Sequence, residues 1–188
     1  MSVRTPLATL AGALVLLAQP PVQAATALGP PPLPLPEGRL MLLAGNAHAT
    51  NFVALDQSTR SGAVADAWIY TASAHPIALP PHGDDPPRIV VQTFQHLRID
   101  CAAHRTRRLR VTGYDSEGQA LLTLRPDAEA RWIDQFTTEH FAAKTLCDGA
   151  RLPGAYVVVG HDTALKTARV LFARQADRDQ HQLRRPQS

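Results

Sequence analysis

The sequence predicts an α+β fold, a single domain in which an antiparallel sheet of about five or six strands is packed by one or two helices. Three observations favour this class. Apolar and polar residues alternate along residues 89–101, turn residues occupy Asp115–Gly118 between strand-like runs, and helical patterns appear in the C-terminal third. Two cysteines, Cys101 and Cys147, add one candidate disulfide.

The first 24 residues have the features of a secretory signal. Arg4 precedes an apolar run from Leu7 to Ala18, and small residues lie at the positions that a signal peptidase recognises before the end of Ala24. The apolar run is shorter than the ~20 residues of a membrane-spanning helix, and no later run is longer. We therefore expect a signal peptide over Met1–Ala24 and a periplasmic or secreted mature chain without a transmembrane segment or lipid-anchor cysteine.

A proline-rich leader is expected over residues 25–38, where the run PPPLPLP favours an extended polyproline II conformation. We interpret it as a disordered spacer between the cleavage site and a folded domain over residues 39–176. The remaining residues, 177–188, are charged and end in proline-containing sequence, which predicts a frayed, flexible tail.

The first half of the domain contains strand-length apolar runs. Strands are expected over Arg39–Ala44, Asn51–Asp56 and Ala63–Ala72, with a turn-rich connection at residues 57–62. Five prolines make His75–Pro87 a loop by turn chemistry.

The clearest β pattern follows this loop. Residues 89–101 alternate, His104–Tyr114 forms a second strand, and Gln119–Leu124 forms a third. The tetrapeptide Asp115–Gly118 suits a hairpin turn because glycine readily adopts positive φ. Three consecutive antiparallel strands are therefore the core of the prediction.

Two helices are expected near the C-terminus. The first spans Asp134–Leu146, with Thr137 or Thr138 as its N-cap and Gly149 just beyond its end. A short strand over Tyr156–Val159 precedes the second. That helix is capped by Asp162 or Thr163 and has an apolar stripe of Ala164, Leu165, Ala168, Leu171 and Phe172. In an alternative interpretation, Ala168–Ala173 forms a strand that pairs back on Tyr156–Val159.

The two cysteines are expected to form a structural disulfide. An exported chain meets an oxidising compartment, and two cysteines allow only one intramolecular pairing. A metal-thiolate pair or a redox pair is the alternative, but no C-x-x-C spacing supports either one. We therefore expect Cys101 and Cys147 to be bonded.

The central segment resembles the surface-adhesin protein E-like family of Gram-negative exported proteins. The residues that carry this resemblance run from about Asn51 to Cys147, in the order Asp56, Arg60-Ser61-Gly62, Trp68, Ile99-Asp100-Cys101, Arg107–Val111, Tyr114–Gly118, Trp132-Ile133 and Leu146-Cys147. The resemblance implies an antiparallel sheet packed by a helix and joined to it by a disulfide. It also implies an adhesin-like role, which belongs to the best-known member. The chain lacks the lipid-anchor cysteine and adds the leader and a C-terminal extension from about Arg151.

Five arginines gather on the predicted strand pair: Arg98, Arg105, Arg107, Arg108 and Arg110. Strand alternation places Arg105 and Arg107 on one face and Arg108 and Arg110 on the other. One interpretation is a solvated strand whose charges discourage edge-to-edge pairing. The functional interpretation is a patch that binds sulfated glycans, lipopolysaccharide phosphates or acidic protein segments.

Other candidate chemistry is weaker. His75 and His82 share a loop with Asp84 and Asp85, a mixture of zinc-ligand types, but no H-x-x-x-H or H-x-H spacing supports a metal site. We interpret these histidines as solvated and expect no metal or other cofactor. The sequence contains neither a G-x-S-x-G elbow nor a glycine-rich phosphate loop. Both tryptophans are expected to anchor the core. They are Trp68 and Trp132.

These observations favour an exported, non-enzymatic binding or envelope-associated domain, adhesin-like, with an acidic, glycan or protein ligand. The net charge of +3 falls to +2 when Arg4 leaves with the signal, which is too small to indicate nucleic-acid binding. Two alternatives remain open: a small exported metal-dependent hydrolase that uses the histidine and aspartate loop, and a structural subunit of an envelope complex.

Overall fold

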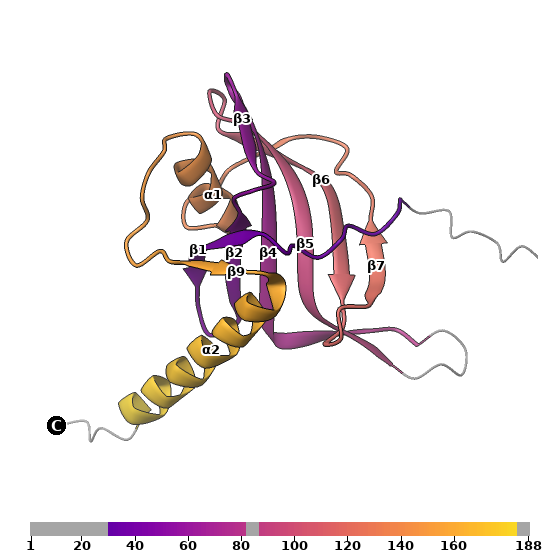
Figure 1. Cartoon of the computed structure of the whole chain (residues 1–188), viewed down its shortest axis with the longest axis vertical. Coiled ribbons are helices and arrows are strands. Elements are labelled where there is room, and N and C mark those ends of the chain that lie inside the picture. The colour runs from indigo at the N-terminus through magenta and orange to yellow at the C-terminus, as the bar shows by residue number, and fades with distance from the viewer. Residues whose placement is uncertain (1–29, 82–86, 184–188) are drawn as a thin grey trace, which may run out of the picture.

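A computed structural model describes residues 30–81 and 87–183. The expected signal peptide, Met1–Ala24, lies outside the described residues, as do residues 25–29 of the leader and the end of the tail from residue 184. Two helices and a large sheet form one body, with the longer helix extending away from the sheet (Figure 1).

Within the described residues, nine strands form the sheet, and every neighbouring pair is antiparallel. They are β1 (Arg39–Gly45), β2 (Ala49–Ala54), β3 (Thr59–Ser61), β4 (Val64–Leu79), β5 (Arg88–Asp100), β6 (Arg105–Tyr114), β7 (Ala120–Leu124), β8 (Arg131–Trp132) and β9 (Val157–Val159). The order is β7-β6-β5-β4-β2-β1-β9, while β3 pairs with β4 and β8 pairs with β6. The α+β class is confirmed, but the expected five or six strands are too few.

Two short strands have no counterpart among those expected from the sequence. β3 lies in the connection that was expected to be only a turn, and it forms a hairpin with the start of β4. Gly62 has a φ of +58° in that hairpin, a conformation that glycine adopts without the steric cost of a Cβ. The other, β8, has only two residues, too few for a periodic pattern to reveal.

The loop expected from His75 was placed too early. β4 continues to Leu79, and Ile77 and Leu79 pair with Val90 and Arg88 of β5. Pro76 is accommodated because it lies within the register shift between Ala72 and Ile77, where the ladder is interrupted.

The predicted strands β5, β6 and β7 are confirmed as a continuous antiparallel meander. The turn between β6 and β7 depends on Asp115, whose carboxylate accepts the backbone N–H groups of Glu117 at 2.9 Å and Gln119 at 2.8 Å. Gly118 has a φ of +82°. Local turn chemistry therefore sets this hairpin, as the sequence indicated.

The sheet buries apolar residues on both of its faces. On the first face, Phe52, Tyr70 and Phe94 pack with residues of α2 (His161–Leu183). On the second face, side chains of β2, β4 and β5 pack with α1 (Thr138–Leu146). Each helix thus covers one face and leaves the rest of that face to other segments.

The helices confirm part of the prediction. Thr137 is the N-cap of α1, and its hydroxyl accepts the backbone N–H of His140 at 3.2 Å, so the helix begins later than the expected Asp134. Ala164, Leu165 and Ala168 are buried on one stripe of α2, which excludes the alternative strand over residues 168–173. The expected frayed tail was also wrong at its start, because α2 continues through residue 183.

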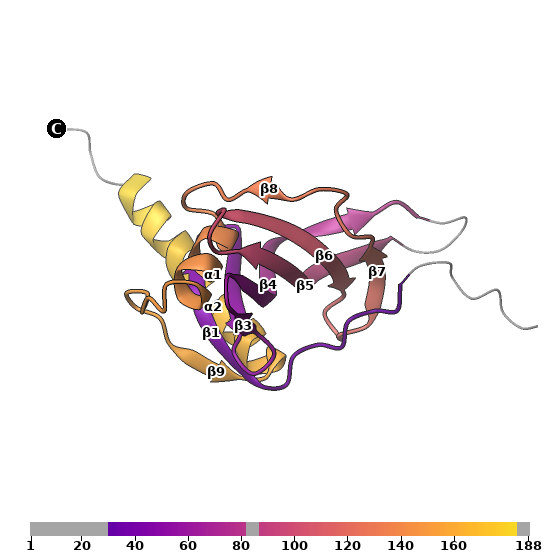
Figure 2. The same ribbon diagram turned by 90° about the horizontal axis from the view of Figure 1, so that it is seen from above.

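The described part of the proline-rich leader is not a free spacer. Residues 30–38 run across the first face of the sheet (Figures 1 and 2). Leu33 is only 5% exposed within the core, its N–H donates to Thr112 Oγ1 at 3.0 Å, and its carbonyl accepts the Tyr114 hydroxyl. The expectation failed because the composition of the leader does not reveal that the sheet buries one of its leucines.

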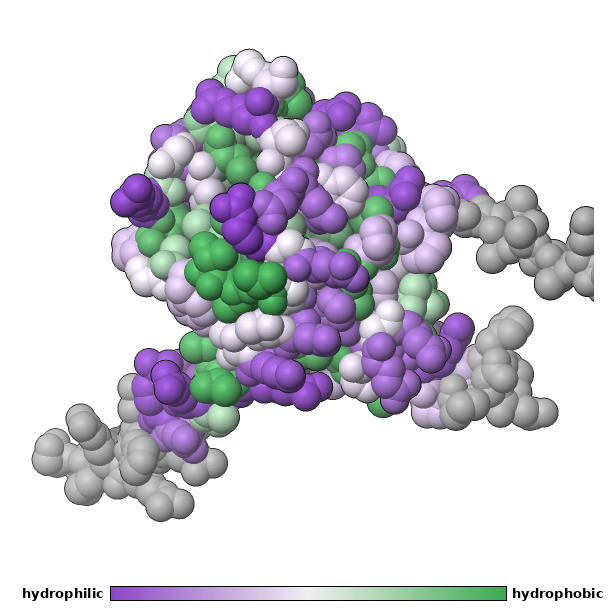
Figure 3. Space-filling view, in the orientation of Figure 1, coloured by the Kyte–Doolittle hydropathy of each residue, from purple (hydrophilic) through white to green (hydrophobic). Residues whose placement is uncertain are grey.

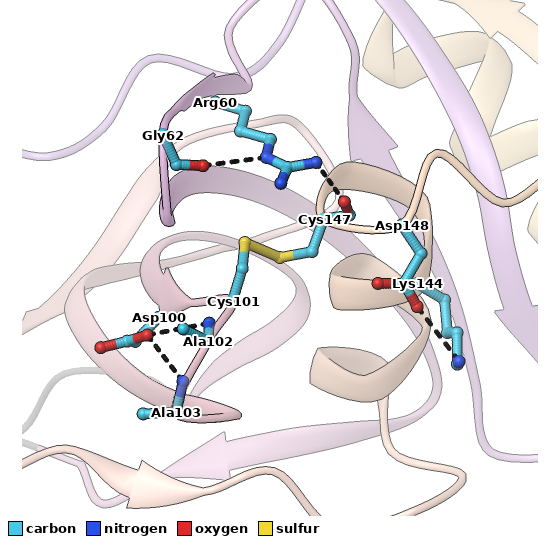
Figure 4. The surroundings of a disulfide bond; sticks show 9 residues. All are labelled: Arg60, Gly62, Asp100, Cys101, Ala102, Ala103, Lys144, Cys147 and Asp148. Atoms are coloured by element: carbon cyan, nitrogen blue, oxygen red, sulfur yellow. Dashed lines mark hydrogen bonds and ion pairs between the residues drawn. A yellow bond between two sulfur atoms is a disulfide. The ribbon is translucent and has the colours of Figure 1, made fainter.

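The expected disulfide is present. Cys101 follows β5 and Cys147 caps α1, with their Cα atoms 5.5 Å apart (Figure 4). Arg60 of β3 donates hydrogen bonds to the Cys147 carbonyl and, at 3.1 Å, to the Gly62 carbonyl. The bond therefore joins the second face of the sheet to the helix that covers it.

The two tryptophans differ in their environments. Trp68 packs against the core of the first face, in agreement with its expected role. Trp132 does not: its two-residue strand lies at the edge of β6, and 67% of its surface is exposed. Over the described residues, no helix combines the length and apolar character needed to cross a membrane.

Candidate functional site

A β-bulge in β6 decides how the arginines are distributed. His96 pairs with Arg110 and Leu97 pairs with Arg108, so Leu109 is an additional residue in β6. Side chains that face each other across an antiparallel pair lie on the same face, and an inserted residue shifts the alternation by one. Arg110 therefore lies on the same face as Arg107, which corrects the expected division of the cluster.

Four of the five arginines consequently share the first face of the sheet. Arg98 pairs with Arg107, and Asp100 pairs with Arg105. Arg110 pairs with His96 and donates a hydrogen bond to the Pro31 carbonyl of the proline-rich leader. We call this surface the basic face; it comprises Arg98, Arg105, Arg107 and Arg110 together with Asp66, Trp68, His96 and Trp132. Hydrophilic side chains are frequent over β5 and β6 in Figure 3, whereas a hydrophobic patch lies near β9.

Arg108 is the exception. It pairs with Leu97, whose side chain belongs to the core of the second face. Its guanidinium forms an ion pair with Asp127 at 2.6 Å, and its backbone N–H donates to the same carboxylate at 3.3 Å. Arg108 therefore fixes the segment after β7 to the edge of β6 and is not available on the basic face.

The floor of the basic face is formed by β4 and β5. The rings of Trp68 and His96 are stacked, with centroids 4.2 Å apart. Asp66 accepts from His96 Nε2 at 3.1 Å and from Arg98 Nε at 3.3 Å. Burial has the largest effect on the pKa of His96 and lowers it. The hydrogen bond that His96 donates to Asp66 opposes this change, and the charges of Arg98 and Arg110 add to the lowering.

The other three arginines bond to backbone carbonyl groups. Among the side chains of residues 30–81 and 87–178, none of Arg105, Arg107 and Arg110 forms an ion pair with a carboxylate. A carbonyl oxygen orients a guanidinium but does not neutralise it, so these charges remain uncompensated. The acceptors are, respectively, the carbonyl oxygens of Ala130, Asp127 and Pro31.

The carboxylate of Asp100 has a structural role beside this cluster. It accepts the N–H groups of Ala102 at 3.0 Å and Ala103 at 2.8 Å and so holds the turn between β5 and β6.

Arg98 and Arg107 face each other directly, which is a repulsive arrangement that Asp66 offsets on one side only. The basic face is thus electrostatically suited to an anion.

The histidine and aspartate loop is largely outside the described residues. His82, Asp84 and Asp85 lie outside the described residues. His75 is on β4, and the centroid of its ring lies 4.9 Å from that of His48. Within the described residues, no group of three or more histidine, cysteine, aspartate or glutamate residues is arranged to hold a metal ion. Three of the four residues on which the hydrolase alternative depends therefore lie outside the part of the chain that the structure describes.

Sequence reasoning missed several members of the basic face. Asp66 lies 32 positions before Arg98 and joins it only through the register of β4 and β5. His96 stands in an alternating strand, where nothing in the local pattern separates it from any solvated histidine. Trp132 was expected in the core, although its neighbour Arg131 and the two-residue length of β8 place it at a sheet edge.

Comparison with known proteins gives no further assignment. No family model, no curated protein and no solved structure matches this chain.

Proposed function

We propose that the protein is an exported, non-enzymatic binding domain that holds polyanionic ligands on the basic face and acts in the periplasm or outside the cell. The observation that carries the proposal is the direct pairing of Arg98 with Arg107, flanked by two further arginines without carboxylate partners in the described chain. Like charges placed opposite each other destabilise a sheet. A bound polyanion would relieve that repulsion and gain charge-assisted hydrogen bonds.

Three features support an adhesin-like binding role over catalysis. The charged side chains lie on the strands of a disulfide-linked sheet, which holds them in fixed positions. Guanidinium groups bind sulfate, phosphate and carboxylate groups but are poor general acids or bases, because they stay protonated. The resemblance to the surface-adhesin protein E-like family implies the same class of role.

The test is retention on immobilised heparin, used as a defined polyanion, at increasing salt. Replacing Arg98 and Arg107 with glutamine removes the facing pair, and we expect earlier elution and a shallower salt dependence, by about one unit in the slope of log K against log salt for each lost contact. The matched control is Arg174→Gln/Arg178→Gln, which makes the same change in net charge on exposed positions of α2.

The two double variants separate a specific face from general positive charge. If both elute equally early, only net charge matters and the proposal is wrong. If neither changes, the arginines on the strands are merely solvated. A thermal melt of each variant establishes that the sheet is intact before binding is compared.

A further inference from the structure

The exposed indole of Trp132 is the feature of the basic face that charge alone does not explain. It is a large aromatic side chain with 67% of its surface accessible, on a short strand at the edge of β6. Trp132 pairs with Arg105, so its side chain lies on the same face as the arginines. A polyanion site therefore ends in an aromatic platform.

One side of the indole is already occupied. The guanidinium carbon of Arg105 lies 5.6 Å from the ring centroid, within the range of a cation–π interaction. The same guanidinium donates to the Ala130 carbonyl, which fixes its position over the ring. The remaining exposed surface of the indole is thus presented next to a fixed positive charge.

Contacts on both sides of Trp132 tie β8 to the rest of the domain. Arg131 forms an ion pair with Glu139 of α1 at 2.5 Å. On the other side, the N–H of Ile133 donates to the His104 carbonyl at 3.1 Å. A site held in place before binding loses less conformational entropy when a ligand arrives.

We infer that the ligand of the basic face is an anionic polysaccharide, a chain of pyranose rings carrying sulfate, phosphate or carboxylate groups, and that Trp132 stacks against one ring. This inference rests on the proposed function and narrows its ligand class. The C–H groups on the flat side of a pyranose are weakly positive and pack against the negative face of an aromatic ring. The neighbouring arginines then bind the charged substituents.

Two of the three alternative ligand classes lack one of these two elements. An acidic peptide or inorganic polyphosphate supplies charge without a flat ring of C–H groups. A single-stranded nucleic acid supplies both charge and stacking bases, but the sequence predicts export through Met1–Ala24 and a disulfide joins Cys101 to Cys147, which favour an extracytoplasmic ligand. These molecules therefore serve as comparison probes.

The experiment measures affinity for four probes by calorimetry at one salt concentration: a heparin hexasaccharide, polyphosphate, polyglutamate and oligo-dT. Trp132→Ala is expected to weaken hexasaccharide binding about tenfold, the upper range for loss of an aromatic contact, and to leave polyphosphate and polyglutamate binding within twofold. Trp132→Phe retains an aromatic ring, and its affinity for the hexasaccharide is expected to lie between those of the parent and Trp132→Ala. Phe136→Ala, which removes another exposed aromatic side chain beside α1, is the matched control and is expected to bind like the parent.

The results distinguish this inference from the proposed function. If Arg98→Gln/Arg107→Gln weakens polyphosphate binding but Trp132→Ala leaves the hexasaccharide unaffected, the saccharide inference is wrong and the anion-binding proposal stands. If oligo-dT binds more tightly than the hexasaccharide and depends equally on Trp132, the ligand is a nucleic acid. If the arginine variant binds every probe like the parent, both proposals fail.

Discussion

The indole of Trp68 and the imidazole of His96 lie parallel on neighbouring strands, with their planes 6° apart and their centroids separated by 4.2 Å. The stack shields the imidazole from water, while Asp66 contacts its Nε2 atom. Arg98 and Arg110 place positive charge nearby. Burial and these two positive charges lower the pKa of His96, which lies at the centre of the basic face.

This arrangement predicts that the fold loses stability as the pH falls. Burial lowers the pKa of His96 in the folded protein from its usual 6.5, whereas the unfolded chain keeps the usual value. Below about pH 6.5 the unfolded state therefore binds a proton that the folded state resists, and the free energy of unfolding decreases until the pH has passed the folded pKa. Urea denaturation between about pH 7 and about pH 5 measures this decrease.

His96→Phe provides the comparison, because it keeps a ring on Trp68 and cannot be protonated. We expect a smaller decrease of stability over the same pH interval than in the parent. His48→Phe, which removes an exposed histidine outside the basic face, is the control and is expected to follow the parent. Identical pH dependence in the parent and the His96 variant would contradict the prediction.

The disulfide is expected to stabilise the fold without contributing to ligand binding. It closes a separation of 46 residues, and the chain-entropy estimate for such a loop is about 4 kcal/mol. Cys101→Ala/Cys147→Ala is therefore expected to unfold at lower urea concentration and yet elute from heparin with the parent, since the bond lies on the face opposite to the arginines. Loss of retention in a variant that stays folded would place the bond within the binding surface.

Leu33 is expected to anchor the proline-rich segment to the sheet. Leu33→Ala removes a buried side chain of the core cluster on the first face, and the expected loss is about 2–5 kcal/mol of unfolding free energy. Pro34→Ala changes an exposed neighbour in the same segment and serves as the control, with a loss of less than about 1 kcal/mol. Urea denaturation reports the stability of both variants.

Limited proteolysis gives a second measurement of the same contact. If the segment depends on Leu33, the Leu33 variant is cleaved within residues 30–38 faster than the Pro34 variant under native conditions. Equal cleavage and equal stability in the two variants would mean that the segment contributes nothing to the fold, contrary to the burial of Leu33.

Several elements could be predicted from the sequence because their causes are local. Alternation over residues 89–101 is a property of consecutive side chains, and the turn at Asp115 depends on a carboxylate that accepts N–H groups two and four residues later. The cap at Thr137 and the apolar stripe of α2 also involve neighbours within one or two helical turns. The pairing of Cys101 with Cys147 followed from their number.

The basic face could be predicted only in part. Its arginines were visible as a cluster, but strict alternation put Arg110 on the wrong face. Nothing in the neighbouring sequence indicates that Leu109 is the additional residue of a β-bulge. Asp66 and Trp68 reach the cluster through the register of β4 against β5. That register depends on which apolar residues of distant strands can be buried together, and spacing within one strand does not determine it.

The sequence by itself determined the class of the fold, the central hairpins, the first helix and the disulfide, since periodicity, turn chemistry and cysteine count act over short stretches or need no geometry. The tertiary structure alone decided that Leu33 is buried, that Pro76 lies within a strand and that Trp132 is exposed. Each of these depends on the surface that another part of the chain presents. A leucine in a proline-rich run is buried only where distant strands present an apolar surface to it, and a tryptophan stays exposed where the sheet ends beside it.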